Sequence, residues 1–231
     1  MIQRLTASLA LILFGSSASW AGPMLSSSVY GTPAALTGLR TESQFVTGGD
    51  WAADSLTQQI AWVITNNGNG TWDYLYTFTN FVSPAMSHWI LDLSDDAVIP
   101  TVDPHAVTNV VPNFPLVFGT FGPAPSNPGF PTGTSIVGVK FDNLNDPGSP
   151  FTIKFTSNRS PVWGDWYAKG GRDSFAYNAG LTDHDSTNVN DFIARPDSAS
   201  PPPVPEPSTL ALAGLAGLGL AGWSRCRRAR S

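Results

Sequence analysis

The chain has almost no cysteine: Cys226, close to the C-terminus, is the only one among 231 residues. One cysteine cannot form a disulfide within a single chain, so burial of apolar side chains and backbone pairing must stabilise the fold. The material for burial is present, because the chain contains 13 Phe, 8 Trp and 5 Tyr residues. A small scaffold held together by disulfides is therefore excluded.

Positive charge is scarce in the middle of the chain. Residues 22–203 contain 16 Asp and Glu residues against 7 Lys and Arg residues, a formal charge of −9 with neutral His. The whole chain has a formal charge of only −5, because Arg4 and four arginines near the C-terminus belong to its ends. Non-specific binding to nucleic acid needs a basic surface, so we expect no nucleic-acid partner.

Familiar catalytic and metal-binding motifs are also missing. His88, His105 and His184 lie in separate segments without metal-ligand spacing, and no His-Glu-x-x-His or Gly-x-Ser-x-Gly pattern occurs. We therefore expect the histidines at surface or turn positions and a protein without catalytic activity. Residues 183–191 and 142–146 are rich in side-chain oxygens, which calcium prefers. Such loops more often cap their own backbone, so we expect no cofactor, with calcium kept as an alternative.

Long apolar runs are lacking too, and the first short run lies at the N-terminus. Arg4 precedes a mostly apolar stretch over residues 5–14, and Ser19-Trp20-Ala21 follows it. A positive charge, a short apolar segment and small residues three and one before a cut are typical of a secretory signal peptide. We therefore assign residues 1–21 to a signal peptide that signal peptidase removes after Ala21, and expect an exported protein.

Residues 22–195 have the pattern of β-strands separated by Gly, Pro, Asn and Asp. The clearest signal is a hairpin, in which residues 58–65 and 71–79 flank the turn sequence Asn-Asn-Gly-Asn-Gly. The many prolines of residues 100–135 favour loops and edge strands there. Many short strands, each with one apolar face, predict an all-β domain: a single antiparallel β-sandwich, jelly-roll-like or immunoglobulin-like. Other candidate strands are 86–93, 116–121, 137–142, 151–156 and 162–168.

Two groups of aromatic residues belong either to the core or to a ligand site. The alternating row from Trp72 to Phe78 shares one face of a strand, and we expect that face in the core. Trp163, Trp166 and Tyr167 lie beside charged and glycine residues, so we predict that these rings are partly exposed at a strand end. Exposed rings of this kind would contact a polysaccharide, which makes a carbohydrate-binding module the alternative function.

The C-terminal region has three parts that follow a Pro- and Ser-rich linker at residues 196–203. Residues 204–208 read Val-Pro-Glu-Pro-Ser, Leu210 to Trp223 form an apolar run, and an arginine cluster ends the chain. The run can enter a membrane as a helix, although it is shorter than the ~17 residues of a usual span. Four arginines would remain on the cytoplasmic side and stop translocation: Arg225, Arg227, Arg228 and Arg230.

This three-part order resembles the PEP-CTERM sorting domain of Gram-negative bacteria that make exopolysaccharide. The resemblance covers residues 204–231 and implies recognition at Val204, Pro205, Glu206 and Pro207. It also implies cleavage by an exosortase, a membrane cysteine transpeptidase, after a transient inner-membrane stage. Such tails also carry the label of an ice-binding protein C-terminal region, which we treat as a name for the tail.

The function expected from these features is that of an exported structural or adhesive protein of the cell surface or extracellular matrix. Ice binding would instead predict threonines at a fixed period. Thr77 and Thr79 form one Thr-x-Thr unit that does not recur regularly along the chain.

Overall fold

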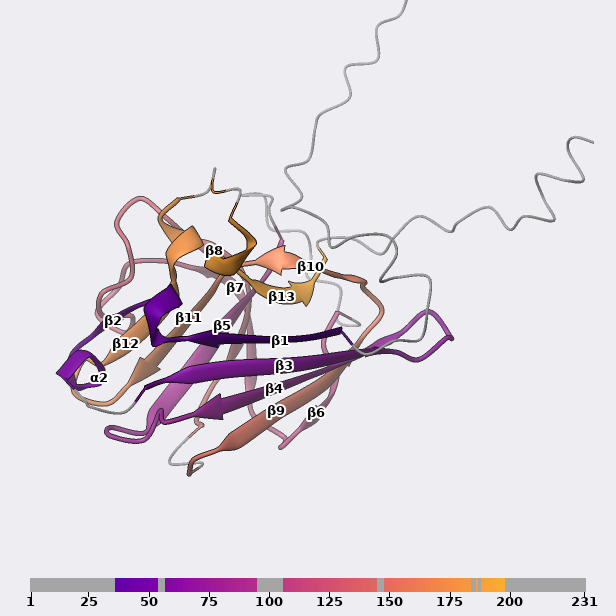
Figure 1. The fold of residues 1–231 in the computed structure, drawn as a ribbon, viewed down its shortest axis with the longest axis horizontal. Helices are drawn as coiled ribbons and strands as arrows, with labels where there is room; N and C mark the ends of the chain where they lie inside the picture. Colours follow the sequence, from indigo (N-terminus) through magenta and orange to yellow (C-terminus); the bar gives the residue numbers. More distant parts are fainter. Residues whose placement is uncertain are drawn as a thin grey trace, which may run out of the picture.

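The computed structural model describes residues 36–53, 57–94, 106–144, 148–183, 186 and 188–197. These residues form antiparallel strands in two sheets that face each other, with a two-stranded ribbon beside them (Figure 1). The five-stranded sheet has the order β1 (Leu36–Thr41), β3 (Gln59–Asn66), β4 (Trp72–Thr79), β9 (Phe151–Ser157) and β6 (Thr108–Val111). The all-β prediction is confirmed for this part of the chain.

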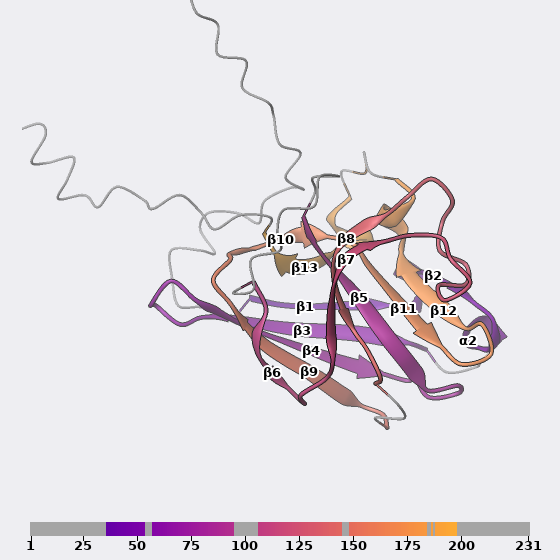
Figure 2. The same ribbon diagram turned by 180° about the vertical axis from the view of Figure 1, so that it is seen from behind.

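The six-stranded sheet lies behind the first and is seen from its own side in Figure 2. Its order is β2 (Phe45–Gly48), β12 (Phe175–Asn178), β11 (Trp166–Gly170), β5 (Met86–Ser94), β8 (Ile136–Phe141) and β7 (Leu116–Phe121). The ribbon pairs β10 (Pro161–Gly164) with β13 (Ile193–Pro196). The helical elements are short: η1 (Glu42–Gln44), α2 (Asp50–Ala53), η2 (Ala179–Leu181) and η3 (Val189–Asp191).

The predicted hairpin is confirmed by the pairing of β3 with β4 from Gln59↔Thr79 to Asn66↔Trp72. Gly68 lies in the turn at φ +73°, a conformation that glycine adopts without steric cost. The Gly68 amide also donates to the Asn66 side-chain oxygen over 2.8 Å. The Asn and Gly residues of the turn therefore set the register of the hairpin.

The aromatic row of β4 faces the core, as expected, and packs against the opposite sheet. The ring of Trp89 on β5 lies 4.9 Å from Tyr76 and 5.0 Å from Phe78, measured between ring centroids. Phe141 on β8 similarly lies 5.7 Å from Phe155 on β9. Since the inner faces of the two sheets share one apolar cluster, the described residues form a β-sandwich.

The proline-rich segment also behaves as predicted from residue 106 onward, where its strands β6 and β7 are each the last strand at one edge of their sheets. The expected single strand over residues 162–168 is wrong. It is broken at Asp165 into β10 and β11, which pair with different partners. The break lets the chain leave the ribbon and enter the six-stranded sheet, where the Asp165 carbonyl accepts from the Asp92 amide over 3.0 Å.

The outer side of the six-stranded sheet is covered by the chain itself. Phe130 lies in the loop between β7 and β8, and its ring is 4.9 Å from that of Tyr167 on β11. The Tyr167 hydroxyl donates to the carbonyl oxygen of Pro128 in the same loop over 2.7 Å. A second apolar cluster thus lies between the sheet and this loop.

Candidate functional site: the anchor of the C-terminal strand

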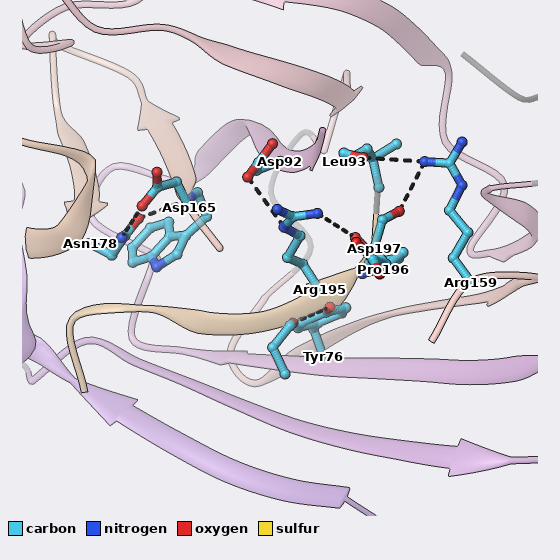
Figure 3. Close-up of polar contacts among 11 residues, drawn as sticks. Tyr76, Asp92, Leu93, Arg159, Asp165, Asn178, Arg195, Pro196 and Asp197 are labelled. Atoms are coloured by element: carbon cyan, nitrogen blue, oxygen red, sulfur yellow. Dashed lines mark hydrogen bonds and ion pairs between the residues drawn. The ribbon is translucent and has the colours of Figure 1, made fainter. Parts of the chain in front are cut away.

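Strand β13 is the last described strand before the tail, and all four of its residues are buried. It includes Pro196, which the sequence analysis had placed in the linker, and the described chain ends one residue later at Asp197. Its partner β10 pairs with it from Pro161↔Pro196 to Gly164↔Ile193. A short strand with one strand partner needs further contacts, and buried polar side chains supply them (Figure 3).

Arg195 on β13 is fully buried and carries a charge into the fold. Its Nε lies 3.2 Å from Oδ2 of Asp92 on β5, and its Nη1 donates to the Pro196 carbonyl oxygen over 2.9 Å. A buried cation requires such compensation, because removal from water is costly. Gly164 on β10 makes room for Arg195, since a Cβ at this glycine would lie 2.1 Å from the Arg195 Nε.

Tyr76 joins the core of the sandwich to the backbone of β13. Its hydroxyl donates to the Ala194 carbonyl oxygen over 2.7 Å. Burial raises the pKa of Tyr76 well above its ordinary value, although the positive charge of Arg195 acts in the opposite direction. The hydroxyl therefore keeps its proton and acts as a donor to β13.

Arg159 holds the point at which the described chain ends. Its Nη1 donates to the Leu93 carbonyl over 3.2 Å and to the Asp197 carbonyl over 3.0 Å. The Asp197 amide in turn donates to the Ser160 carbonyl oxygen over 2.9 Å. Arg159 is itself fixed, because the Tyr74 hydroxyl donates to its carbonyl oxygen over 2.9 Å.

Arg40 on β1 holds the other end of β13. Its Nε donates to the Phe192 carbonyl over 2.9 Å, and its Nη2 donates to the Val189 carbonyl over 2.7 Å. The guanidinium carbon lies 5.0 Å from the centre of the Trp62 ring and 5.4 Å from that of Trp163, within cation–π range. Burial lowers the pKa of Arg40, and the charge of Asp191 opposes this shift.

Asn178 on β12 links the segment before β13 to the six-stranded sheet. Its Nδ2 donates to Asp165 Oδ1 over 2.6 Å and to the Asp191 carbonyl over 2.7 Å, while its Oδ1 accepts from the Trp166 amide over 2.8 Å. We call the set of residues that hold β13 the strand anchor: Arg40, Tyr76, Asp92, Arg159, Asn178 and Arg195.

The strand anchor attaches β13 to the rest of the fold through hydrogen bonds and one ion pair. Its arginines, its tyrosine and its asparagine donate mainly to backbone carbonyls of the chain itself, and Asp92 balances the charge of Arg195. Charge-assisted hydrogen bonds to a buried backbone are stronger than neutral ones. The arrangement therefore fixes β13 to both sheets at once.

The three aromatic residues predicted to contact a ligand occupy different environments. The prediction of partial exposure is wrong for Trp166 and Tyr167, both of which are fully buried. β11 is an inner strand of its sheet, so Trp166 packs on Phe45 in the core, with ring centroids 4.9 Å apart, and Tyr167 lies beneath Phe130. Trp163 is half-buried, with its ring 6.1 Å from that of Trp62.

His88 is buried on β5, so the expectation of a surface or turn position is wrong for this histidine. Burial, together with the nearby charge of Lys140, lowers the pKa of His88 to about 4. His105 and His184 lie outside the described residues. The sequence pattern did not show that the side of β5 bearing His88 is covered by the loop after β7.

The oxygen-rich stretch before β13 caps its own backbone where it is described. Asn188 Oδ1 accepts from the Asn190 amide over 3.2 Å, and Asn188 Nδ2 donates to Asp191 Oδ1 over 3.0 Å. In the described part of the chain, no group of three His, Cys, Asp or Glu side chains is placed to hold a metal ion. The described part of this loop is thus capped by its own side chains, as the sequence analysis expected of such a loop.

The tail that follows the strand anchor is similar to a known sorting signal. Residues 203–228 match the PEP-CTERM protein-sorting motif. The resemblance seen in the sequence is thereby confirmed, and the motif marks an exported protein that exosortase processes. No curated protein and no solved structure matches the chain.

The match to the PEP-CTERM motif begins at Pro203, six residues after Asp197. Even fully extended, six residues reach only about 20 Å, so the strand anchor lies close in the chain to the processed tail. The predicted signal-peptide cut after Ala21, the sorting motif at residues 204–207 and the four tail arginines lie outside the described residues. Among the residues described, no helix has the length and apolar character to cross a membrane.

The strand anchor itself was missed by sequence reasoning. Its arginines had one visible signal: they are three of only seven basic residues in a long acidic segment, residues 22–203. A rare positive charge in such a segment suggests a specific contact within the fold. The contacting residue cannot be predicted from the sequence, because the contacts join distant positions. Arg40 and Phe192, for example, are 152 residues apart.

Proposed function

We propose that the β-sandwich is a display domain, which exosortase processing places at the cell surface or in the extracellular matrix. There it has a structural or adhesive role without catalytic activity. The observation that carries this proposal is the strand anchor, which fixes the fold to the segment that leads into the PEP-CTERM motif.

The physical argument concerns where a pull on the tail would enter the fold. A domain attached through its C-terminus receives any external load first at Asp197 and then along β13. Arg159, Tyr76 and Arg195 spread that load to β9–β10, β4 and β5. If a domain is held at its C-terminus, buried contacts near the C-terminus contribute most to its resistance to unfolding under load.

The polysaccharide-binding alternative receives less support from the structure. It rested on three exposed aromatic rings, and two of them, Trp166 and Tyr167, are buried in the sandwich. Trp163 is half-buried beneath the Arg40 guanidinium and packs against Trp62. The proposed display role therefore does not require a surface of exposed aromatic rings that binds sugars.

The test compares the matrix of a producing strain with that of a deletion strain complemented by defined variants. Wild-type protein should restore surface localisation and matrix cohesion, while E206A should restore neither, because it alters the sorting motif. E42A is the matched control, since Glu42 is the only other glutamate in the chain, and it should behave like the wild type.

The same experiment separates a structural role from an enzymatic one. Purified mature protein should leave the chain length and composition of the matrix polysaccharide unchanged while the deletion strain loses cohesion. If the purified protein shortens or modifies the polysaccharide, or if the deletion leaves both adhesion and cohesion intact, the display proposal is wrong.

A further inference from the structure

The outer face of the five-stranded sheet differs from that of the six-stranded sheet. The loop between β7 and β8 covers the six-stranded sheet, whereas the outward residues of β1, β3, β4, β9 and β6 remain accessible. Figure 1 shows these five strands side by side on the near side of the molecule. We call the outward side of these five strands the bare face.

A row of outward residues crosses the bare face from Thr37 at one edge to Val111 at the other, and three of its five members are apolar. The strand register places Val63 beside Leu75, Leu75 beside Lys154, and Lys154 beside Val111. In the neighbouring row, Leu39 lies beside Ala61. Leu39 is 49% exposed, Val63 38% and Val111 59%, so this apolar surface is open to a partner.

Threonines fill most of the remaining positions of the bare face. They come from all five strands, and the cross-strand pairs include Thr77↔Thr152 and Thr108↔Thr156. A threonine presents one methyl and one hydroxyl group, so it packs against an apolar or a polar neighbour without burying a charge. The outward threonines of these strands are Thr37, Thr41, Thr65, Thr77, Thr79, Thr108, Thr152 and Thr156.

Charge is almost absent from the bare face, although residues 22–203 have a formal charge of −9. Of the three charged residues in these five strands, Arg40 is buried in the strand anchor, and Asp73 and Lys154 form an ion pair of 2.9 Å. Two copies of this acidic chain repel each other least where they meet through this face. Under a two-fold axis near β4 and β9, Asp73 of each copy would also meet Lys154 of the other.

We infer that the bare face binds a second copy of this chain in a symmetric, face-to-face dimer. Five strands that are ~4.8 Å apart and ~23 Å long cover a flat area of roughly 500 Å² per copy. The uneven surface of the side chains adds to this area. Stable complexes bury about 800 Å² per partner, so the bare face has the right order of size. Self-association would give a displayed protein a way to join neighbouring copies.

Sedimentation velocity of the mature protein, purified from a host with exosortase, tests this inference. Across micromolar concentrations the wild type should reach the dimer mass. V63E should raise the dimer dissociation constant by about 100-fold or more, because the symmetric interface buries the new charge twice. V46E is the matched control: Val46, on β2 of the other sheet, is 37% exposed, and its substitution should leave the dimer unchanged.

A charge reversal tests the two-fold arrangement. D73K should weaken the dimer, and D73K/K154D should restore it, while thermal melts confirm that each variant is folded. A wild type that stays monomeric, equal effects of V63E and V46E, or a double variant that fails to recover would each overturn the inference. The inference would also be overturned if the wild type stayed monomeric and bound the host polysaccharide in a way that V63E abolished. The ligand of the bare face would then be a glycan.

Discussion

At the residue scale, the main feature is a set of charges placed inside the fold. Arg195 and Asp92 form a buried ion pair, and Arg159 and Arg40 donate to backbone carbonyls nearby. A buried ion pair adds little net stability compared with an apolar pair, but it is costly to break. These residues therefore specify the position of β13 more than they add to the free energy of unfolding.

Replacement of Arg195 by Met should lower the free energy of unfolding by about 3–5 kcal/mol, because Asp92 stays buried without this cation. D92N/R195M should recover part of the loss, since the remaining partner is neutral. Urea denaturation of the purified protein measures both values. R172M is the matched control, because the ion pair of Arg172 with Asp50 is exposed, and it should change the value by less than about 0.5 kcal/mol. Equal losses for R195M and R172M would contradict this account.

His88 makes stability dependent on pH. Its pKa is about 4 in the folded protein, below the ordinary value of 6.5, because burial and Lys140 disfavour the charged form. The unfolded chain therefore binds more protons between these values, so stability is complete above pH 6.5 and falls as the pH drops towards 4. The loss attributable to this group is of the order of 3 kcal/mol.

Denaturation curves measured from pH 4 to pH 7 should show a shallower slope for H88Q than for the wild type. H105Q and H184Q provide matched controls, since they replace the other two histidines of the chain. If H88Q retains the slope of the wild type, another group is responsible for it.

At the scale of elements, β13 closes the sandwich although it belongs to neither large sheet. Its backbone accepts from Tyr76 on β4, and the residues on either side of it accept from Arg40 on β1 and Arg159. Because β13 is short, these contacts and the pairing with β10 must together keep it in place. β13 thus brings the described fold to Asp197, the last described residue before the tail.

Truncation experiments test this boundary. A stop codon after Asp197 retains the strand anchor, so the thermal midpoint should match that of the mature protein. A stop codon after Asp191 removes β13, exposes Trp163 and leaves Asp92 without Arg195, and should lower the midpoint by 10 °C or more, at roughly 2–4 °C per kcal/mol for a chain of this size. Similar midpoints for the two truncated proteins would show that β13 contributes nothing to the fold.

At the scale of the whole molecule, the chemistry of the ends differs from that of the segment between them. The acidic, cysteine-free segment 22–203 contains the sandwich, while the only cysteine and four arginines lie in the tail, after its Pro-Glu-Pro sequence at residues 205–207. Processing at the motif would therefore change both the net charge and the thiol content of the protein. This difference allows processing to be followed without an antibody to the tail.

A maleimide reagent should label the precursor made in a host without exosortase, because Cys226 is the only thiol. The product of a host with exosortase should not be labelled and should migrate at a lower mass. Denaturing gels with a fluorescent maleimide report both properties together. An unprocessed E206A variant gives the positive control, and a labelled mature product would show that Cys226 remains after sorting.

Local patterns were sufficient to predict the parts of the fold that local chemistry controls. The Asn- and Gly-rich turn, the alternation of β4 and the prolines before β7 each act within a few residues, so the hairpin, the inward aromatic row and the edge strands followed from the sequence. The order of motif, apolar run and arginines likewise identified the PEP-CTERM tail, because all three parts lie in one continuous stretch of the sequence.

Only the tertiary structure determined which side chains are buried and which residues share one face of a sheet. Trp166 and Tyr167 looked exposed beside polar neighbours, yet sheet order places their strand inside. The strand anchor joins positions such as Tyr76 and Ala194, 118 residues apart, and no local pattern encodes such a contact. Threonines without any period in the sequence share one face, because strand register, which depends on the whole sheet, brings them together.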